Sequence, residues 1–269
     1  MPERLLWVCV SVMVVLCGVY LLRRRVEYPV LEENNEFAGF MYSMIGLVYG
    51  VYLAFTIIAV WEQFSSAEDV AVSEATHLSA LWRDAQTMRA EDRAAIQQEL
   101  LAYTDSVVRD EWPSMARDHG ASPRTSGIYE DLWRRYYAVQ LDAGNAVQMA
   151  FYQEMIRRLN DMGMLRRRRL LAANSELPPL MWILLLVGAV VTILFTFLFG
   201  TRHAWTQYVV IGVVTGLVAF SILLVDAMQY PFSGDVSIRP DAYESVVKSM
   251  KERAAAANFV SPQSTARSR

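Results

Sequence analysis

Apolar residues gather in four blocks, each long enough to cross a lipid bilayer as a helix. The blocks cover residues 5–22, 39–64, 177–199 and 207–230. A transmembrane helix needs about 20 mainly apolar residues, and continuous runs of this length are typical of membrane spans. The pattern therefore predicts an all-α integral membrane protein with four transmembrane helices.

The first block has two interpretations, a retained membrane helix or a cleaved signal peptide. Signal peptides carry a positive n-region and a small-residue cleavage site. Here Arg4 stands beside Glu3, and no small-x-small site follows residues 5–22. The sequence therefore favours a membrane helix.

The second block runs into polar sequence without a helix breaker. Residues 65–88 contain no proline or glycine. Their small and apolar positions keep an i, i+3, i+4 spacing: Ala67, Ala71, Ala75, Leu78, Trp82 and Ala85. This spacing predicts an amphipathic helix, so we expect one helix that leaves the membrane as a stalk.

The polar segment that follows shows helical periodicity and no strand-like alternation. A helix is predicted over 91–111, ending at Trp112-Pro113 because proline disfavours helix in the residue before it. A loop is expected over 117–127, then a helical region over 128–173 with a break near Gly144 or Gly163.

These elements predict four parts of the chain: a first helix pair (1–64), a helical polar domain inserted between the second and third spans (65–176), a second helix pair (177–230) and a polar tail (231–269) whose residues 261–269 look disordered. Four spans place both termini on one side of the membrane. Most arginines near the spans then share the side of the polar domain, which the positive-inside rule makes cytoplasmic. Arg23, Arg24 and Arg25 in the first loop argue the other way.

Composition and motifs exclude several function classes. The chain has 269 residues, 54% of them hydrophobic, a net charge of −3 and no basic tract, which argues against nucleic acid as a partner. His77, His119 and His203 lie far apart, and Cys9 and Cys17 share the first block, so no metal-ligand spacing is present. Phosphate-binding glycine loops and hydrolase motifs are absent as well. We expect no enzyme activity, no metal and no cofactor.

Small residues recur every four positions in two of the blocks. Gly46 and Gly50, extended by Ala54, lie in the second, and Gly212 and Gly216 in the fourth. Such spacing lets helix backbones approach closely. Packing within one chain is the simpler interpretation, and contact between the chains of an oligomer is the other.

Ser43, Leu47 and Val51 form a stripe beside the first two glycines, because steps of three or four residues stay on one side of a helix. If the glycines pack helices around an axis, this stripe lines an ion path with a hydrophobic constriction. Contact with lipid or with the protein core is the simpler interpretation.

Charged residues near the span ends also have two interpretations each. Glu62 and Asp226 are candidates for function at membrane depth or for interfacial carboxylates reached by water. The basic run before the third span predicts a topology anchor, and binding of anionic lipid or attraction of anions is the alternative. The run consists of Arg166, Arg167, Arg168 and Arg169.

Two stretches resemble segments of bestrophins. Residues 50–64, GVYLAFTIIAVWEQF, are similar to the end of the second membrane helix there. The segment Tyr230-Pro231-Phe232-Ser233-Gly234 resembles the Asn-Pro-Phe-Gly element after the fourth span. With Glu74, Ala75 and residues 178–182, the pattern resembles the bacterial bestrophin-like family, a domain of unknown function, over nearly the whole chain.

The resemblance implies a pentamer in the bacterial inner membrane, with second helices that surround a pore for small anions. The neck would fall near Ser43, Leu47 and Val51, which lack the aromatic rings of the animal proteins, so gating and selectivity are open. The calcium clasp is reduced to three acidic residues: Asp235, Asp241 and Glu244. We therefore expect a homo-oligomer in membrane lipid that passes anions, or else a non-conducting scaffold or sensor whose helical domain binds a cytosolic partner.

Overall fold

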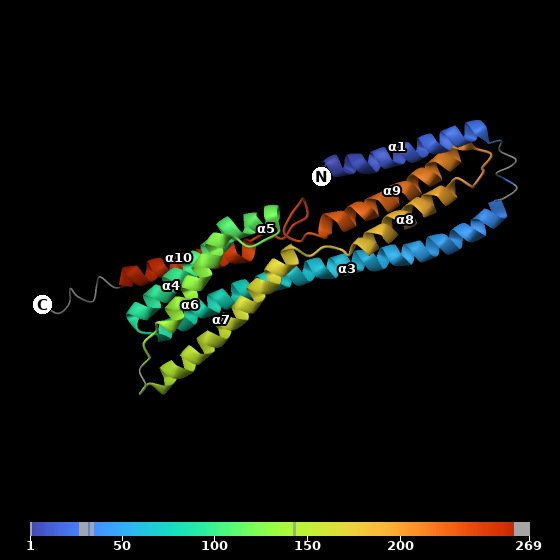
Figure 1. Ribbon diagram of the computed structural model, residues 1–269. Coiled ribbons are helices and arrows are strands. Elements are labelled where there is room, and N and C mark those ends of the chain that lie inside the picture. The colour runs from blue at the N-terminus through green and yellow to red at the C-terminus, as the bar shows by residue number, and fades with distance from the viewer. Residues whose placement is uncertain (1, 27–31, 33–34, 142–143, 261–269) are drawn as a thin grey trace. The chain divides into compact units, whose positions relative to one another are not determined.

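The protein is described by a computed structural model that covers residues 2–26, 32, 35–141 and 144–260. Every regular element in these residues is a helix (Figure 1). The long elements are α1 (Pro2–Arg25), α3 (Asn35–Asp84), α4 (Ala90–Ser106), α6 (Pro123–Tyr137), α7 (Ala146–Ala173), α8 (Pro179–Thr196), α9 (Ala204–Met228) and α10 (Asp241–Val260). Among the described residues, α1, α3, α8 and α9 are the four helices long and apolar enough to cross a membrane. The predicted all-α fold with four such helices is confirmed; the predicted disorder of 261–269 lies outside the described residues.

The chain forms two compact units. One, the membrane unit, consists of Met1–Phe64 and Glu176–Gln229, and the other, the polar unit, of Ser65–Ser175 and Tyr230–Arg269. The segment after α9 thus belongs to the same unit as the polar insertion. Helix α3 contributes to both units and runs unbroken for 50 residues, as the lack of a helix breaker after residue 64 predicts.

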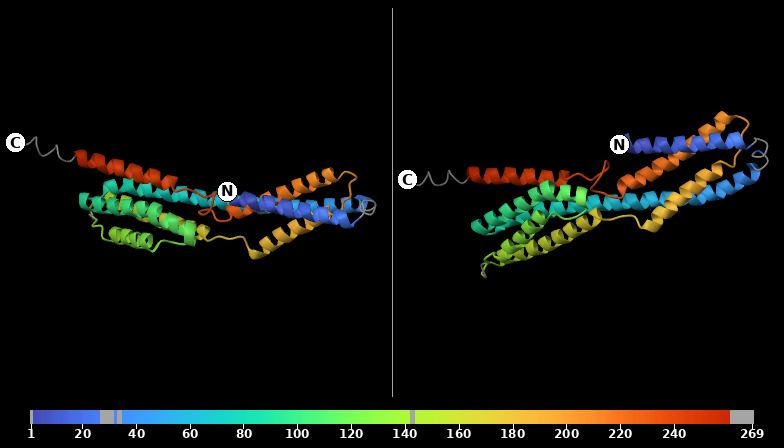
Figure 2. Two further views of the ribbon diagram at one scale, coloured as in Figure 1. Left: turned by 90° about the horizontal axis from the view of Figure 1, so that it is seen from above. Right: turned by 45° about the horizontal axis from the view of Figure 1, so that its top comes forward.

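In the membrane unit, α1 lies along α9, as all three views show (Figures 1 and 2). The two glycines of α9 lie in this contact: Gly212 faces Val12 and Leu16 of α1, and Gly216 faces Val12. A Cβ atom at either position would make ordinary van der Waals contact with these α1 side chains, at 3.9–4.0 Å.

Helix α3 packs on α8 through two tyrosines. The Tyr49 ring lies over Gly188, where a Cβ atom would collide with it, and its hydroxyl donates to the Leu185 carbonyl oxygen at 3.3 Å. One turn further on, the Tyr52 hydroxyl donates to the Met181 carbonyl oxygen at 2.7 Å. The tyrosines therefore fix one face of α3 against α8.

Polar contacts join the end of α1 and the start of α3 to the turn between α8 and α9. The Asn35 side chain donates to the Gly200 carbonyl oxygen at 2.7 Å and accepts from the Gly200 N–H at 3.0 Å. Arg23 donates to Gln207 Oε1 at 2.8 Å and to the Thr201 carbonyl oxygen at 3.1 Å. One of the first-loop arginines thus has a structural role.

The predicted helix end at Trp112-Pro113 is wrong. After α4 the chain passes through the π-helical segment η2 (Val107–Glu111) directly into α5 (Trp112–Asp118). In η2 the Trp112 N–H donates to the Val107 carbonyl oxygen, five residues back. Pro113 then stands in the first turn of α5, where a missing N–H costs little. The predicted loop is correspondingly shorter, because α5 reaches Asp118 and α6 begins at Pro123.

Of the two expected positions for a break in the third helical region, the structure has the one near Gly144, because α6 ends at Tyr137 and α7 begins at Ala146. Helix α7 starts at an N-cap in which the Asn145 side chain accepts from the Gln148 N–H at 3.0 Å. Gly163 leaves α7 unbroken and instead provides room for the hydroxyl of Tyr129 from α6.

Candidate functional site

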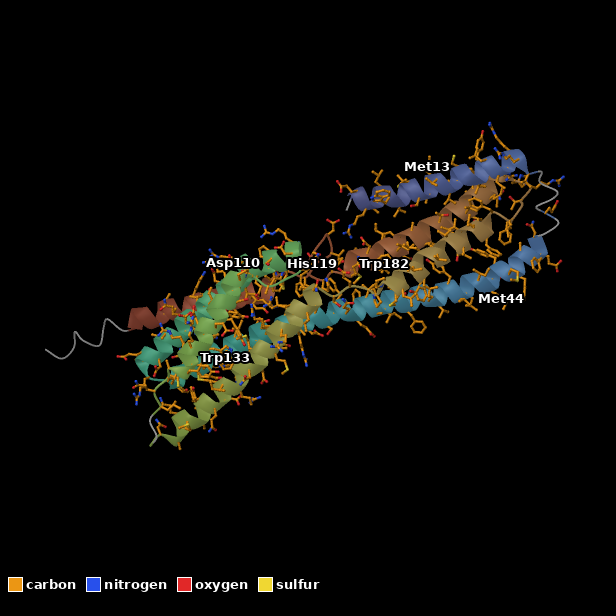
Figure 3. All side chains as sticks on the ribbon, in the orientation of Figure 1. Met13, Met44, Asp110, His119, Trp133 and Trp182 are labelled. Carbon is orange, nitrogen blue, oxygen red and sulfur yellow. The ribbon has the colours of Figure 1, made fainter. Side chains whose placement is uncertain are left out.

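The predicted pore stripe lies on a face of α3 that no other part of the described chain covers. Leu47 is 68% and Val51 49% exposed, and Ser43 is also exposed. A Cβ atom at Gly46 or Gly50 would meet no described atom within 4 Å, and Ala54 is exposed. We call these six positions the open face of α3; Met44, labelled in Figure 3, marks this region of the helix.

The two glycine pairs therefore differ. Gly212 and Gly216 contact α1 of the same chain, whereas Gly46 and Gly50 contact no other helix of the described chain. Close packing of another helix on Gly46 and Gly50 therefore requires a helix from outside the described part of the chain.

Glu62 and Asp226 stand in different surroundings. Glu62 is exposed on α3, one turn beyond exposed Ile58. Asp226 lies 3.5 Å from Arg4 of α1 and accepts from the Gln229 side chain at 3.1 Å. Asp226 thus links α9 to α1 at the end of the membrane unit where α9 ends.

The structure divides the basic run in two. Arg167 and Arg168 are exposed, and the role of topology anchor stays a prediction for them. Arg166 and Arg169 are buried in the polar unit, on one face of α7, because three residues bring a helix back to the same side.

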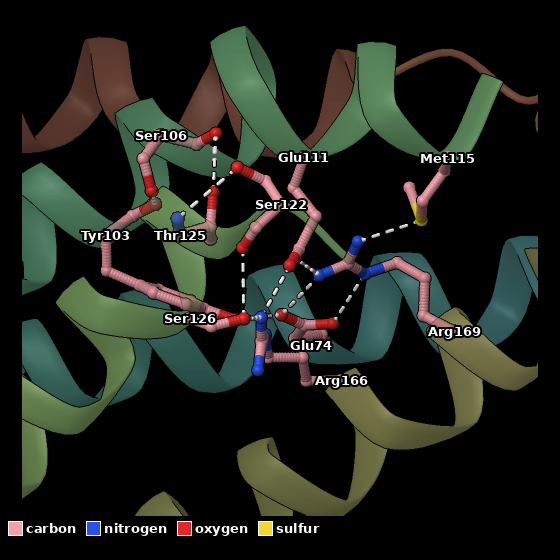
Figure 4. A network of polar contacts seen from close by, with 10 residues as sticks. All are labelled: Glu74, Tyr103, Ser106, Glu111, Met115, Ser122, Thr125, Ser126, Arg166 and Arg169. Atoms are coloured by element: carbon pink, nitrogen blue, oxygen red, sulfur yellow. Dashed lines mark hydrogen bonds and ion pairs between the residues drawn. The ribbon is translucent and has the colours of Figure 1, made fainter. Parts of the chain in front are cut away.

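These two arginines form a buried network with Glu74 of α3 and Glu111 of η2 (Figure 4). Arg169 donates from Nε to Glu74 Oε2 at 2.8 Å, from Nη2 to Glu74 Oε1 at 3.1 Å and from Nη2 to Glu111 Oε2 at 2.8 Å. Arg166 Nη2 donates to Glu111 Oε1 at 2.5 Å. Two carboxylates and two guanidinium groups meet, so the formal charges cancel.

Aromatic rings enclose the network. The Tyr103 hydroxyl donates to Glu74 Oε1 at 2.8 Å. The Arg169 guanidinium lies 5.5 Å from the ring centres of both Trp112 and Tyr243. Burial, followed by the nearby Glu74 carboxylate, raises the pKa of Tyr103 well above its usual value. Burial by itself lowers the pKa of Arg169, but Glu74, Tyr243 and Glu111 outweigh it and raise that pKa, so the guanidinium stays charged.

The segment after the fourth membrane helix packs on the same tryptophan. The Phe232 ring meets Trp112 edge to face at 5.3 Å, and Trp112 Nε1 donates to the Ile238 carbonyl oxygen at 3.0 Å. The Ile238 N–H donates to the Pro231 carbonyl oxygen at 2.8 Å, which closes the turn. Gly234 has a φ of 83°, a conformation that favours glycine.

A family comparison decides which class of protein this architecture belongs to. The bestrophin-like domain matches residues 9–243. The chain belongs to the bestrophin-like family. With its four membrane-length helices, this bestrophin-like protein is a multi-pass membrane protein.

Solved structures share the fold at low sequence identity. A variant of a bacterial bestrophin homologue from Klebsiella pneumoniae is 13% identical, with a TM-score of 0.71 over 91% of this chain and 98% of that chain. Another variant of that homologue is 14% identical, with a TM-score of 0.69 and coverages of 93% and 97%. A structure described as a membrane protein is 12% identical, with a TM-score of 0.72 and coverages of 94% and 98%. No curated protein matches the sequence.

The three acidic residues that the resemblance relates to a calcium clasp belong to no metal-binding group in the described part of the chain. No group of three or more His, Cys, Asp or Glu side chains that could hold a metal ion occurs there. Asp235, Asp241 and Glu244 are exposed around the start of α10.

The buried network is a site that the sequence does not predict. Glu74 enters only through the family resemblance, and no motif marks Glu111, Tyr103 or Tyr243. Two signals were present: Glu74 interrupts the buried stripe of Ala71, Ala75 and Leu78, and the outer two of four arginines share one helix face. A charged residue on an apolar stripe requires a buried partner, because an unpaired buried charge is very costly.

Proposed function

We propose that this bestrophin-like protein assembles as a homo-oligomer, a pentamer by family resemblance, and forms an ion channel with α3 around its axis. The observation that carries the proposal is the open face of α3. One side of this helix is fixed to α8 by Tyr49 and Tyr52, while the other presents Gly46, Gly50 and Leu47 to no part of the described chain.

The open face has the residues that both parts of the proposal require. Gly46, Gly50 and Ala54 allow another helix to approach the α3 backbone closely. Leu47 and Val51 supply the apolar side chains of a constriction that closes by excluding water. Lipid alone needs no small residues at this spacing, so the combination favours contact between copies of the chain.

The family resemblance makes small anions the first candidates for the permeant ion. A specific feature of α3 favours cations as the second. Val51, Ile58, Glu62 and Asp69 are all exposed, and each follows the one before it by four or seven residues. Such steps keep residues on one side of a helix, so Glu62 and Asp69 share the side of Val51 and Ile58. Rings of carboxylates in a pore attract cations.

The side of the membrane belongs to the same proposal. The arginines near the spans support a cytoplasmic polar unit, in a protein of the bacterial inner membrane. A cysteine introduced at exposed Arg168 should then be protected from a membrane-impermeant maleimide in intact cells. Labelling there without lysis would reverse the orientation.

Reconstitution into liposomes tests conduction. The purified protein should give an ion flux above that of empty liposomes, and Leu47→Ala should increase it, because a smaller side chain widens the constriction. Leu184→Ala is the matched control, since Leu184 is 51% exposed on α8. No flux above empty liposomes would contradict the channel and support a non-conducting scaffold or sensor. Equal changes of flux in both variants would remove Leu47 from the constriction.

A further inference from the structure

A crevice opens between α1, α8 and α9, inside the membrane unit. Its volume is about 620 Å³, within the range of about 300–1,000 Å³ that ligand sites occupy. Helix α1 contributes Arg4 and Val15, α8 contributes Trp182 and Ile193, and α9 contributes Thr215 and Asp226. All three helices have membrane-length apolar sequence, so the crevice lies within the bilayer.

The crevice is as deep as one leaflet. On each of the three helices its lining extends over 12 residues, and the steps between the first and the last, at 1.5 Å each, add up to about 16 Å. The hydrocarbon core of a bilayer is about 30 Å thick, so half of it is about 15 Å. A cleft of this depth accommodates the acyl chain of a lipid from one leaflet.

The two ends of the crevice differ in polarity. Its mouth holds the ion pair of Arg4 with Asp226, flanked by Trp7 and Trp182, whereas apolar side chains dominate its interior. Tryptophan is enriched at the membrane–water interface. The polar mouth, the tryptophans beside it and the apolar interior therefore match, in this order, the headgroup, the interfacial region and the acyl chain of a bound lipid.

The mouth presents charges of both signs. The side chains of Arg4 and Asp226 are 31% and 48% exposed, with Nη1 and Oδ2 3.5 Å apart. The other carboxylate oxygen, Oδ1, accepts from Gln229, whose own Oε1 accepts from Trp182 Nε1 at 3.2 Å. Asp226 is therefore held at the mouth from the α8 side, with part of its surface still accessible to water.

We propose that this crevice binds one phospholipid whose headgroup carries both a phosphate and a primary ammonium, as in phosphatidylethanolamine. The phosphate pairs with Arg4, the ammonium donates to Asp226, and one acyl chain fills the crevice as far as Thr215. An anionic headgroup without an amine can pair its phosphate with Arg4, but it has no cation to offer Asp226, so two anions share one guanidinium. A choline headgroup has no N–H to donate, whereas a primary ammonium has three.

The bound chain contacts both α1 and α8, the two helices that form the walls of the crevice on either side of α9. The lipid therefore completes the packing of the membrane unit. This role is independent of conduction, so a protein without ion flux would still bind the lipid.

Native mass spectrometry of the full chain, delipidated in a non-ionic detergent, tests the proposal. Phosphatidylethanolamine, phosphatidylcholine and phosphatidylglycerol are added in turn. We expect phosphatidylethanolamine to bind about tenfold more tightly than either of the others, since charge-assisted hydrogen bonds contribute about this factor. Equal binding of the three lipids would overturn the assigned headgroup.

Two variants that fill the crevice separate a site from general lipid adhesion. Ala219→Trp on α9 and Val190→Trp on α8 both place an indole in the cavity, and each should abolish the preference. Leu217→Trp is the matched control, because Leu217 is 65% exposed and is not part of the lining. Retention of the preference by the folded filling variants would overturn the site.

The headgroup contact has its own variant. Asp226→Asn keeps the size of the side chain and removes the charge, so binding of phosphatidylethanolamine should fall to the level of phosphatidylcholine. If the preference stays tenfold in this variant, the ammonium does not pair with Asp226 and the headgroup assignment fails.

Discussion

The guanidinium group of Arg169 on α7 donates two hydrogen bonds, of 2.8 and 3.1 Å, to the two carboxylate oxygens of Glu74 on α3. Both side chains are fully buried. Removal of two such charges from water costs several kcal/mol per ion, and further hydrogen bonds to the pair offset part of this cost. Glu111 accepts one such bond from Arg169, and Tyr103 donates one to Glu74.

Glu74→Ala should destabilise the polar unit strongly. The substitution leaves Arg169 buried with only Glu111 as a charged partner, and loss of one member of a buried pair costs about 3–5 kcal/mol. We expect a clearly lower midpoint of thermal unfolding in detergent, measured by the change in intrinsic tryptophan fluorescence.

Arg168→Ala is the control for this loss, because Arg168 is exposed on the same helix. Its free energy of unfolding should lie within about 0.5 kcal/mol of that of the unchanged protein, as is usual for surface substitutions. Equal midpoints for Glu74→Ala and Arg168→Ala would show that the buried pair contributes nothing.

High pH should unfold the polar unit through its buried tyrosines. Burial raises the pKa of Tyr103 and Tyr243 well above 10.0. Because the folded state holds these protons more tightly than the unfolded state, the two hydroxyls contribute stability that is complete below about pH 10. That contribution is lost as the pH rises from 10 toward the folded pKa values. In an alkaline titration followed by the ultraviolet absorbance of tyrosinate, these two tyrosines should therefore ionise well above pH 10, cooperatively and together with unfolding.

The double variant Tyr103→Phe with Tyr243→Phe removes both protons. It should weaken the pH dependence above pH 10, of which a part remains because burial also raises the pKa of Tyr136 in the same unit. It should also unfold more easily at neutral pH, since Glu74 loses a hydrogen bond. An alkaline transition at the same pH in this variant would assign it to other groups.

Gly188→Val should weaken the contact between α3 and α8. A Cβ atom at this position collides with the Tyr49 ring, and that ring is held by its hydroxyl bond to Leu185. Overpacking of this kind costs about 1–3 kcal/mol, measured as a lower unfolding midpoint in detergent. Addition of Tyr49→Leu should recover part of the loss because it frees the space; no recovery would place the clash elsewhere.

The same substitution at Gly46 should act on assembly. Nothing within 4 Å of a Cβ there belongs to the described chain, so Gly46→Val should leave the fold of one chain intact. If α3 helices pack on each other, the added side chains separate them, and size-exclusion chromatography with light scattering should report a smaller oligomer. An unchanged oligomer mass would remove Gly46 from the interface.

The positions of the membrane helices could be predicted because a long apolar block is a local signal. The continuation of α3 could be predicted for the same reason, since a helix persists where no proline or glycine interrupts it. The path through Pro113 could not: a π-helical turn keeps the helix going, and such turns have no simple sequence pattern.

The buried network could be predicted only in part. Glu74 and Arg169 are 95 residues apart, and their contact depends on how α3 and α7 pack. The helix face shared by Arg166 and Arg169 was readable, but which carboxylates meet them was not. Likewise, the stripe of Ser43, Leu47 and Val51 followed from helical spacing, whereas its exposure depends on where Tyr49 and Tyr52 anchor α3.

Glu62→Gln should change ion selectivity if α3 lines the pore. Glu62 follows the exposed stripe of Val51 and Ile58, and in a symmetric oligomer each carboxylate becomes a ring. Loss of that ring should shift the reversal potential under a salt gradient toward anions, because a ring of carboxylates attracts cations and repels anions. Glu91→Gln is the matched control, since Glu91 is exposed at the start of α4. If both variants keep the reversal potential of the unchanged channel, Glu62 does not face the ion path, and α3 must present a different side to the axis.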